Sequence, residues 1–210
     1  MYKQQRNYEN IQKALYHGVG DYQIPQIQPV QYNGCEWIGF NYASSATMRE
    51  HKGVHFYLDD YQFIRLWTNV DNYIPMLKQF KYVMAPDFSL FTDFPKALQI
   101  YNHYRKHWLA AYLQANDVRV IPTICWSDEQ SFDWCFDGEP THSVVSVSSV
   151  GTRQKKGAYD LFLAGYREMV RRLKPQQIIF YGNVPEGCGE NIVQIKSFQD
   201  KFKEVVCGGW

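Results

Sequence analysis

Polar side chains follow the apolar segments of this chain, and their types are those that bind and cleave small polar molecules. Asp87 follows residues 82–86, and Asp128 follows residues 118–125. Two carboxyl groups in different surroundings can divide the work of general acid and general base, as they do in enzymes that cleave glycosidic bonds. We therefore take Asp87 and Asp128 as the candidate catalytic pair.

Further side chains beside these segments are candidates for binding a substrate. They are Asn41, Asp59, Asp60, Ser89, Asn102, Arg105, Trp126, Ser148 and Tyr181. Trp126 offers an aromatic face on which a sugar or a base can stack. A group of carboxylates can instead hold Mg²⁺ through oxygen ligands, so the cofactor is left open and no metal ligand is assigned. No glycine-rich nucleotide-cofactor motif follows a strand.

Two of these candidates also have a structural interpretation. An aspartate after a strand often caps the next helix, and Asp128 fits that role. Arg105 falls on the apolar stripe of the expected helix 96–115, where a guanidinium needs an anionic partner or must reach water. If Arg105 is buried, we expect Asp87 or Asp59 to be its partner.

The elements that position these residues alternate between strands and helices. Helices are expected over 96–115 and 158–173, with shorter ones near 7–16, 61–67, 72–79, 131–136 and 198–206. Strands are expected at 37–41, 54–58, 82–86, 118–125, 143–148, 177–181 and 192–195. Apolar strands alternating with helices are typical of parallel sheets, and seven strands come close to the eight of a β/α barrel.

We therefore expect an α/β fold, namely a small or incomplete (β/α) barrel-like fold with mostly parallel strands. An open doubly wound α/β sheet is the alternative. In both folds the carboxyl ends of the strands share one edge, where the candidate residues would converge. Residues 37–210 are expected to form a single α/β domain, and residues 1–36 an N-terminal helix and extended arm packed on it.

Composition narrows the class of protein. Aromatic residues make up 17% of the chain and charged residues 20%, which excludes a disordered chain and a coiled coil. A net charge of +1 does not favour nucleic-acid binding through bulk charge. Segment 153–174 carries seven Lys or Arg against two Asp or Glu, and this basic helix leaves a nucleic acid or another partner open. No apolar run reaches a membrane-spanning length, so no membrane partner is expected.

The cysteines and histidines show no metal-binding motif. Five widely spaced cysteines and the lack of a signal peptide indicate reduced thiols in the cytoplasm. His103 and His107 lie four residues apart on one expected helix, which is a spacing for a metal pair. Because no third ligand is near them in the sequence, we expect them to face solvent.

A series of short motifs occurs in a fixed order along the chain. They are Gly39-Phe-Asn-Tyr-Ala43, His55-Phe-Tyr-Leu-Asp-Asp60, Ala85-Pro-Asp-Phe-Ser-Leu90, Asn102 with Tyr104-Arg105, Val120-Ile-Pro-Thr123, Trp126-Ser-Asp128, Phe136-Asp-Gly138, Ser148-Ser-Val-Gly151, Gly165-Tyr166 and Tyr181-Gly182. With these motifs the chain resembles a bacterial, phage and plasmid family, domain-of-unknown-function family 4417. The resemblance implies a gene carried by phages or mobile elements, and it implies no activity.

Two functions from different classes are consistent with this pattern. The first is an enzyme, a hydrolase acting on a glycosidic or phosphate bond of a nucleotide or sugar-like small molecule at the carboxyl ends of the strands. The second is a non-catalytic phage or mobile-element protein that binds a nucleotide signal or a host protein. A small-molecule ligand is expected for the first, and a host protein is an alternative partner for the second.

Overall fold

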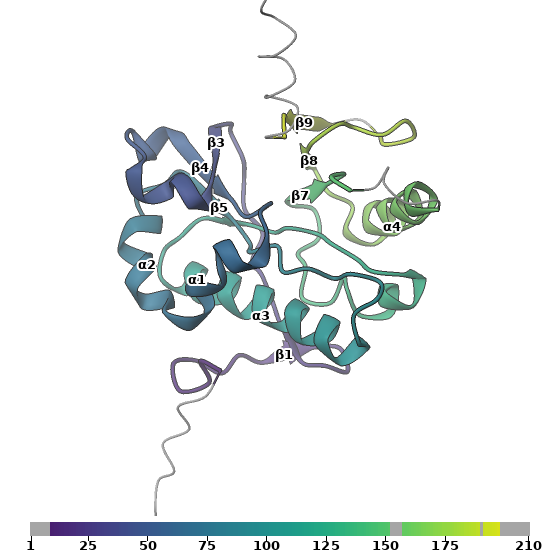
Figure 1. Ribbon diagram of the computed structural model, residues 1–210, viewed down its shortest axis with the longest axis horizontal. Helices are drawn as coiled ribbons and strands as arrows, with labels where there is room; N and C mark the ends of the chain where they lie inside the picture. The colour runs from purple at the N-terminus through teal and green to yellow at the C-terminus, as the bar shows by residue number, and fades with distance from the viewer. Residues whose placement is uncertain (1–8, 152–156, 190, 198–210) are drawn as a thin grey trace, which may run out of the picture.

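Seven parallel strands form the centre of the protein. The computed structural model describes residues 9–151, 157–189 and 191–197 (Figure 1). The strands are β3 (Glu36–Gly39), β4 (Lys52–His55), β5 (Tyr82–Met84), β6 (Val120–Ile121), β7 (Val144–Ser148), β8 (Gln177–Tyr181) and β9 (Ile192–Ile195). They pair in sequence order as two parallel sheets, β3-β4-β5-β6 and β7-β8-β9.

A short parallel bridge joins the two sheets. Thr123 pairs with Ser146, and the backbone N–H of Ile124 donates to Ser146 O over 2.8 Å. The ladder of β6 stops after Ile121, earlier than the expected strand, because Pro122 has no N–H to donate.

The α/β fold is confirmed, with parallel strands that follow one another in sequence order. This is the order of a β/α barrel, whereas a doubly wound sheet reverses its order in the middle. No hydrogen-bonded ladder joins β9 back to β3 within the described residues, so the barrel is not closed. All seven expected strand segments contain a strand of the structure.

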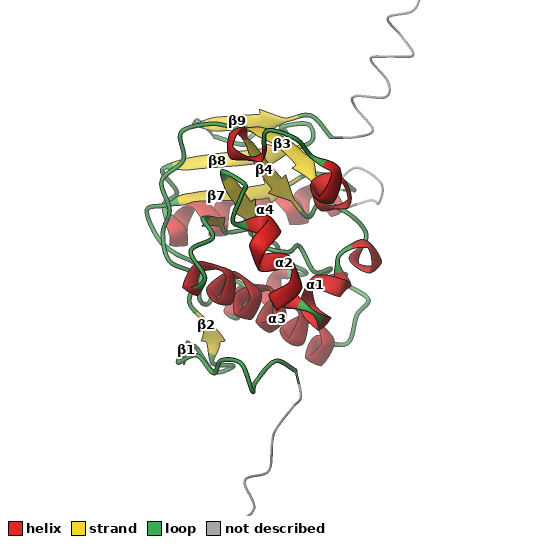
Figure 2. Ribbon diagram, turned by 90° about the vertical axis from the view of Figure 1, so that its left-hand side faces the viewer, coloured by secondary structure: helices red, strands yellow, loops and turns green. Residues whose placement is uncertain are grey.

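Helices cover the outer side of the strands (Figure 2). They are α1 (Ile64–Thr68), α2 (Val70–Leu77), α3 (Lys96–Ala115) and α4 (Ala158–Leu173), with the 3₁₀ helices η1 (Phe40–Ser45), η2 (Arg49–His51), η3 (Asp60–Gln62) and η4 (Glu129–Asp133). α3 starts directly after Pro95, and α4 ends where Lys174 takes a left-handed conformation before Pro175. No described helix has the length and apolar character needed to cross a membrane.

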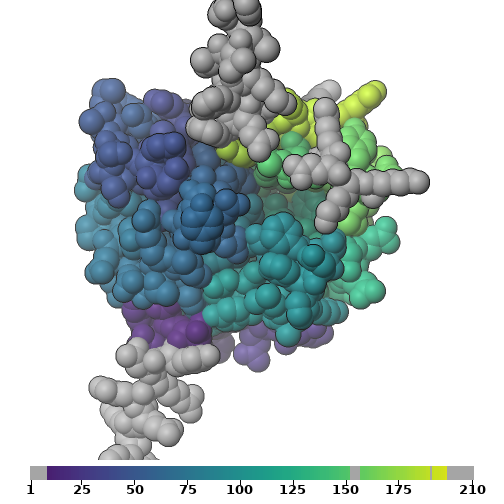
Figure 3. All heavy atoms as spheres, in the orientation of Figure 1, coloured from purple at the N-terminus to yellow at the C-terminus, as the bar shows by residue number. Residues whose placement is uncertain are grey.

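The N-terminal arm packs under α3. A small antiparallel hairpin of β1 (Gly18–Val19) and β2 (Ile24–Pro25) contacts this helix, and the Trp108 indole donates to Ala14 O over 3.0 Å. In the space-filling view the arm lies along the lower side of the molecule (Figure 3). The helix expected near 7–16 does not form over residues 9–16, because Glu9 and Asn10 take positive φ angles of 51° and 61°. Residues 1–8 and the expected helix 198–206 lie outside the described residues.

Two apolar clusters form the core. The larger lies around β3–β6 and α1–α3 and contains Phe56 and Trp108, and the smaller lies between β7, β8 and α4 and contains Phe162 and Tyr166. α4 turns its apolar stripe inward, as the 3.6-residue periodicity predicts. At Gly165 this helix comes so close to Trp126 that an added methyl group would overlap with the indole ring.

We predict that Gly165→Ala lowers the free energy of unfolding by about 1–3 kcal/mol, because the indole must move out of a packed position. Gly189→Ala is the matched control, since an added Cβ there meets no atom within 4 Å. Urea unfolding of the two variants measures the difference. Equal stability of Gly165→Ala and the wild type would show that Trp126 is not held by this contact.

Candidate functional site

A cavity of about 1000 Å³ lies at the carboxyl ends of the parallel strands. Each strand or the segment after it contributes side chains to its wall. The contributors in strand order include Asn41, Asp59, Asp87, Trp126, Ser148, Tyr181 and Lys196. The convergence expected from a parallel sheet is therefore present, because all seven strands end at the same edge.

Most of the sequence-predicted site residues line this cavity. Those that do are Asn41, Asp59, Asp87, Ser89, Trp126, Ser148 and Tyr181. Four others, Asp60, Asn102, Arg105 and Asp128, are not among the lining residues. The cavity thus brings together one of the two predicted catalytic carboxyl groups and six of the predicted binding residues.

Asp87 is the carboxyl group with the most unusual surroundings. Burial raises its pKa from 3.8 to about 7, and the nearby Asp60 adds to this, against the opposing effects of Lys106 and a hydrogen bond from the Cys125 thiol. A carboxyl group with a pKa near neutral can both hold and release a proton under ordinary conditions, as a general acid or base requires.

Aromatic rings form the wall beside Asp87. The rings of Tyr57 and Tyr181 stack with their centroids 4.6 Å apart, and the ring centroid of His55 lies 4.8 Å from that of Tyr181. The Tyr57 hydroxyl shares a hydrogen bond of 2.8 Å with Ser146 Oγ, which fixes the ring. Burial and the neighbouring Asp87 raise the pKa of Tyr57 well above its ordinary value, so it stays a neutral phenol. This wall can stack on a planar ring or on the apolar face of a sugar.

A layer of polar side chains behind the wall holds the Asp87 segment. Asp60 accepts from the Ser89 hydroxyl over 2.8 Å and from the Ser89 N–H over 3.2 Å. The Asn102 amide donates to Ser89 O over 2.7 Å and accepts from Arg105 over 2.5 Å. Residues that we predicted as substrate ligands therefore support the cavity from outside, since their polar atoms are directed at the chain next to Asp87.

A carboxylate partner is expected for Arg105 if its side chain is buried, and the structure places it half-buried and without such a partner among the described residues. No ion pair of Arg105 is found in the described part of the chain. Instead its guanidinium lies 4.1 Å from the centroid of the Phe88 ring and 4.7 Å from that of Tyr101. Two aromatic faces and one amide are its direct contacts, because a guanidinium is weakly hydrated and stacks well on rings. The Asp60 and Glu9 carboxylates oppose the lowering of its pKa by burial without forming an ion pair.

Asp128 occupies the capping position that its sequence context allows. Its Oδ1 accepts from the Ser131 N–H over 3.1 Å at the start of η4. It lines a separate cavity of about 120 Å³ with Gln99 and Trp134. The structure therefore places Asp87 and Asp128 at different cavities, which removes the geometric basis for pairing them as acid and base.

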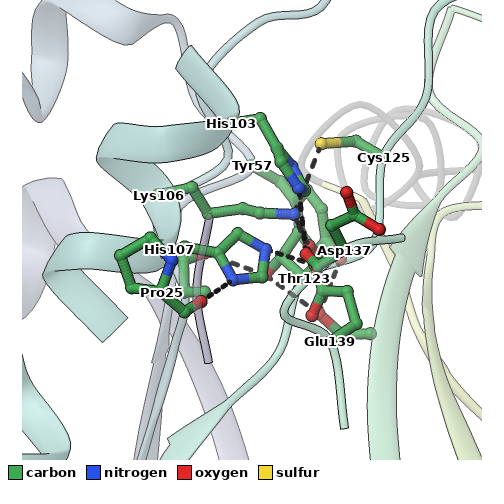
Figure 4. Close-up of polar contacts among 11 residues, drawn as sticks. Pro25, Tyr57, His103, Lys106, His107, Thr123, Cys125, Asp137 and Glu139 are labelled. Carbon is green, nitrogen blue, oxygen red and sulfur yellow. Dashed lines mark hydrogen bonds and ion pairs between the residues drawn. The ribbon is translucent and has the colours of Figure 1, made fainter. Parts of the chain in front are cut away.

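A fully buried charged network joins α3 to the loop around Glu139 (Figure 4). Glu139 Oε1 accepts from Lys106 Nζ over 2.7 Å and lies 2.9 Å from His107 Nε2. The expectation that His103 and His107 face solvent is wrong, since they are 1% and 0% exposed. The β1–β2 hairpin and the loop around Glu139 cover the face of α3 that carries both histidines. Two histidines four residues apart share a helix face, but their spacing does not show whether another segment covers that face.

The charges of this network balance without a metal ion. Ligand atoms of His103, His107 and Glu139 come within 4.8 Å of one another, the only such trio in the described residues. The Lys106 ammonium already supplies a positive charge to Glu139. Both ring nitrogens of His107 face oxygen atoms, Glu139 Oε1 and the Pro25 carbonyl at 2.8 Å. Burial lowers the pKa of His107, and Lys106 and His107 lower the pKa of Glu139 against the effect of burial, so Glu139 stays a carboxylate paired with the Lys106 ammonium. We assign no metal ligands here.

The carboxylates at the carboxyl ends of the strands do not form a group of three that could hold Mg²⁺ within the described residues either.

The basic segment 153–174 offers less free positive charge than its composition indicates. Arg171 and Arg172 both bind Glu168, each at 2.8 Å. Arg153, Lys155 and Lys156 lie outside the described residues.

Parallel strands in sequence order, with one large cavity at their carboxyl ends, define an α/β protein of the incomplete-barrel type. The chain belongs to the family described as Domain of unknown function (DUF4417), whose model matches residues 16–199. The resemblance seen in the motifs is thereby confirmed.

Two phage proteins are similar to the chain, and both are named Gene 1 protein. The one from Mycobacterium phage L5 is 38% identical over 165 residues, which cover 78% of this chain and 72% of the phage protein. The one from Mycobacterium phage D29 is 32% identical over 194 residues, which cover 90% and 72%. No solved structure matches the chain significantly.

We predict that Asp87→Asn stabilises the protein more as pH rises. The folded protein binds the Asp87 proton more tightly than the unfolded chain, so the wild type loses stability between about pH 4 and 7 and levels off above. The asparagine carries no charge, so its advantage at pH 8 is about 4 kcal/mol and vanishes near pH 4. Urea unfolding from pH 4 to 8 measures this, with the exposed Asp93→Asn as the control. A difference that does not change with pH would contradict the raised pKa.

We predict that Asn102→Ala loosens the Asp87 segment. It removes the partners of Ser89 O and of the Arg105 guanidinium, at a cost of about 1–3 kcal/mol in unfolding free energy. Amide hydrogen exchange at Ser89 should accelerate as well. Asn116→Ala is the matched control, because its amide also donates to a carbonyl, Tyr112 O at 2.9 Å, but at the far end of α3. Unchanged exchange at Ser89 would exclude the supporting role.

Proposed function

We propose that the protein is a hydrolase, encoded by a phage or mobile element, that cleaves a glycosidic bond in a nucleotide or sugar-like small molecule. Asp87 is its general acid. The observation that carries this proposal is a carboxyl group with a pKa of about 7 on the wall of a large cavity, beside a stacked aromatic surface. The proposed place of action is the cytoplasm of the bacterial host.

The proposed reaction uses two carboxyl groups that line the same cavity. Asp87 donates its proton to the oxygen or nitrogen of the leaving group as the bond to the sugar carbon breaks. Asp59, which is exposed to water, accepts a proton from the attacking water molecule, whose oxygen forms the new bond. Water is thus added across the broken bond. Asp59 takes the place of Asp128 in the pair, because it shares the cavity with Asp87.

A glycosidic bond is favoured over a phosphate bond. Phosphoryl transfer depends on Lys, Arg or metal ions that neutralise the phosphate oxygens. Among the described residues that line the cavity, Lys196 is the one Lys or Arg. Aromatic rings and hydroxyl groups, in contrast, are the usual partners of sugars and bases.

The second candidate is a non-catalytic protein that retains a small nucleotide signal in the same cavity, and the stacked pair of Tyr57 and Tyr181 supports it equally. Native mass spectrometry of protein purified from cells tests it. A retained small molecule that is never converted, and that Asp87→Asn still binds, would favour this candidate. A retained host protein would favour the masking of a host target.

We predict that turnover of a panel of nucleosides, nucleotides, nucleotide sugars and glycosides, followed by mass spectrometry, identifies a cleaved substrate. Asp87→Asn should then lower kcat/KM by about 10²–10⁴-fold, because the proton donor is lost. Activity should fall as pH rises through about 7, since the general acid must carry its proton.

Asp128→Asn is the matched control for this prediction, because it removes a carboxylate that lies outside the cavity. It should retain nearly full activity when the protein is folded. Full activity of Asp87→Asn, or an equal loss in both variants, would contradict the proposed role of Asp87.

A further inference from the structure

The Lys106 ammonium is enclosed by polar groups of the protein (Figure 4). Lys106 is 1% exposed, and its Nζ atom donates to Thr123 O over 2.8 Å and to Glu139 Oε1 over 2.7 Å. The Cys125 sulfur lies 4.0 Å from the same nitrogen. These three contacts match the three N–H groups of an ammonium, which must replace its lost hydration.

Cys125 lies between the buried ammonium and the cavity, because it is near Lys106 Nζ and also lines the cavity together with Asp87. Burial raises the pKa of the Cys125 thiol, so it keeps its proton and can donate to the Asp87 carboxylate. Burial alone would lower the pKa of Lys106, but the Glu139 carboxylate in contact with it raises the pKa, so the ammonium keeps its charge. Ammonium, thiol and carboxyl group therefore follow one another from the buried network to the cavity.

Four titratable groups from four segments influence the protonation of the Asp87 carboxyl. They are Lys106 from α3, Asp60 from η3, Cys125 from the segment after β6 and Tyr57 from the segment after β4. Asp60 has the same sign of charge as an ionised Asp87, while Cys125 and Tyr57 stay neutral. Lys106 is the cation of this set, and Glu139 balances its charge.

We propose that Lys106 is a positioning residue of the cavity. Held by Thr123 and Glu139, its ammonium positions the Cys125 thiol toward Asp87. The same ammonium supplies a fixed positive charge that favours the ionised form of Asp87. The protein's own ammonium thus serves where other acid–base sites use a bound metal ion. The catalytic meaning of this arrangement rests on the proposed function, but the arrangement itself can be tested without a substrate.

The first test uses the wild-type protein. Carboxyl-carbon NMR follows the protonation of Asp87, and nitrogen NMR follows the Nζ resonance of Lys106. We expect the Lys106 resonance to shift at the pH where Asp87 titrates, and we expect Asp87→Asn to abolish that shift. A Lys106 resonance that does not change while Asp87 titrates would overturn the proposal.

The second test changes the charges. Lys106→Gln combined with Glu139→Gln removes one buried charge of each sign and keeps an N–H donor at each position. The titration of Asp87 should then move upward by about 1 pH unit or more, because the cation that favours its ionised form is gone. Lys78→Met, which removes a surface cation paired with Asp117 at 3.1 Å, should leave it unchanged.

An Asp87 titration at its wild-type position in the folded double variant would overturn the proposal, and if that variant does not fold, the wild-type measurement decides. Activity is a separate readout. If Asp87→Asn stays fully active while Lys106 and Asp87 still titrate together, the proposed function fails and the positioning role of Lys106 stands.

Discussion

The parallel direction of the seven strands is the constraint on which the cavity depends. Every strand from β3 to β9 runs the same way, so each connection must return the chain to the opposite edge before the next strand begins. The connections that contain α3 and α4 do this over the outer face, and the polar segments that follow the strands stay together at one edge. Side chains as distant in sequence as Asn41 and Tyr181 therefore line one cavity. An antiparallel sheet of the same residues would divide them between two edges.

The site has two layers with different chemistry. Asp87 and the aromatic rings face the cavity, while Asp60, Asn102 and Arg105 hold the backbone around Asp87 from behind through Ser89 and Phe88. Such support keeps a reactive group in one geometry, which acid–base chemistry requires. Burial and the charge of Asp60 both raise the pKa of Asp87, so Asp60 supports this segment and also affects its protonation.

The buried network of Lys106, Glu139 and His107 is costly to bury, because each charge loses its hydration. Its members come from α3 and from the loop at residues 136–140, and His107 also contacts the N-terminal arm at Pro25. The network therefore joins three parts of the chain. A hydrophobic cluster of the same size would pack as well, but it would place no positive charge near Cys125 and Asp87. The family membership and the two phage relatives add no activity to this picture, so the site itself carries the functional proposal.

Local chemistry was enough to predict most of the elements and the edge at which the site lies. The apolar period of α4, Pro95 before α3 and the apolar strands act over a few residues, so their effects can be predicted from the sequence alone. Only the tertiary structure decided which polar residues share the cavity. Asp128 points to η4 instead of the cavity, Arg105 stacks on Phe88 instead of pairing with a carboxylate, and His103 and His107 are buried by segments more than 25 residues away. Burial and partner choice depend on which distant segments pack together, and a pattern along the chain carries no information on contacts made across it.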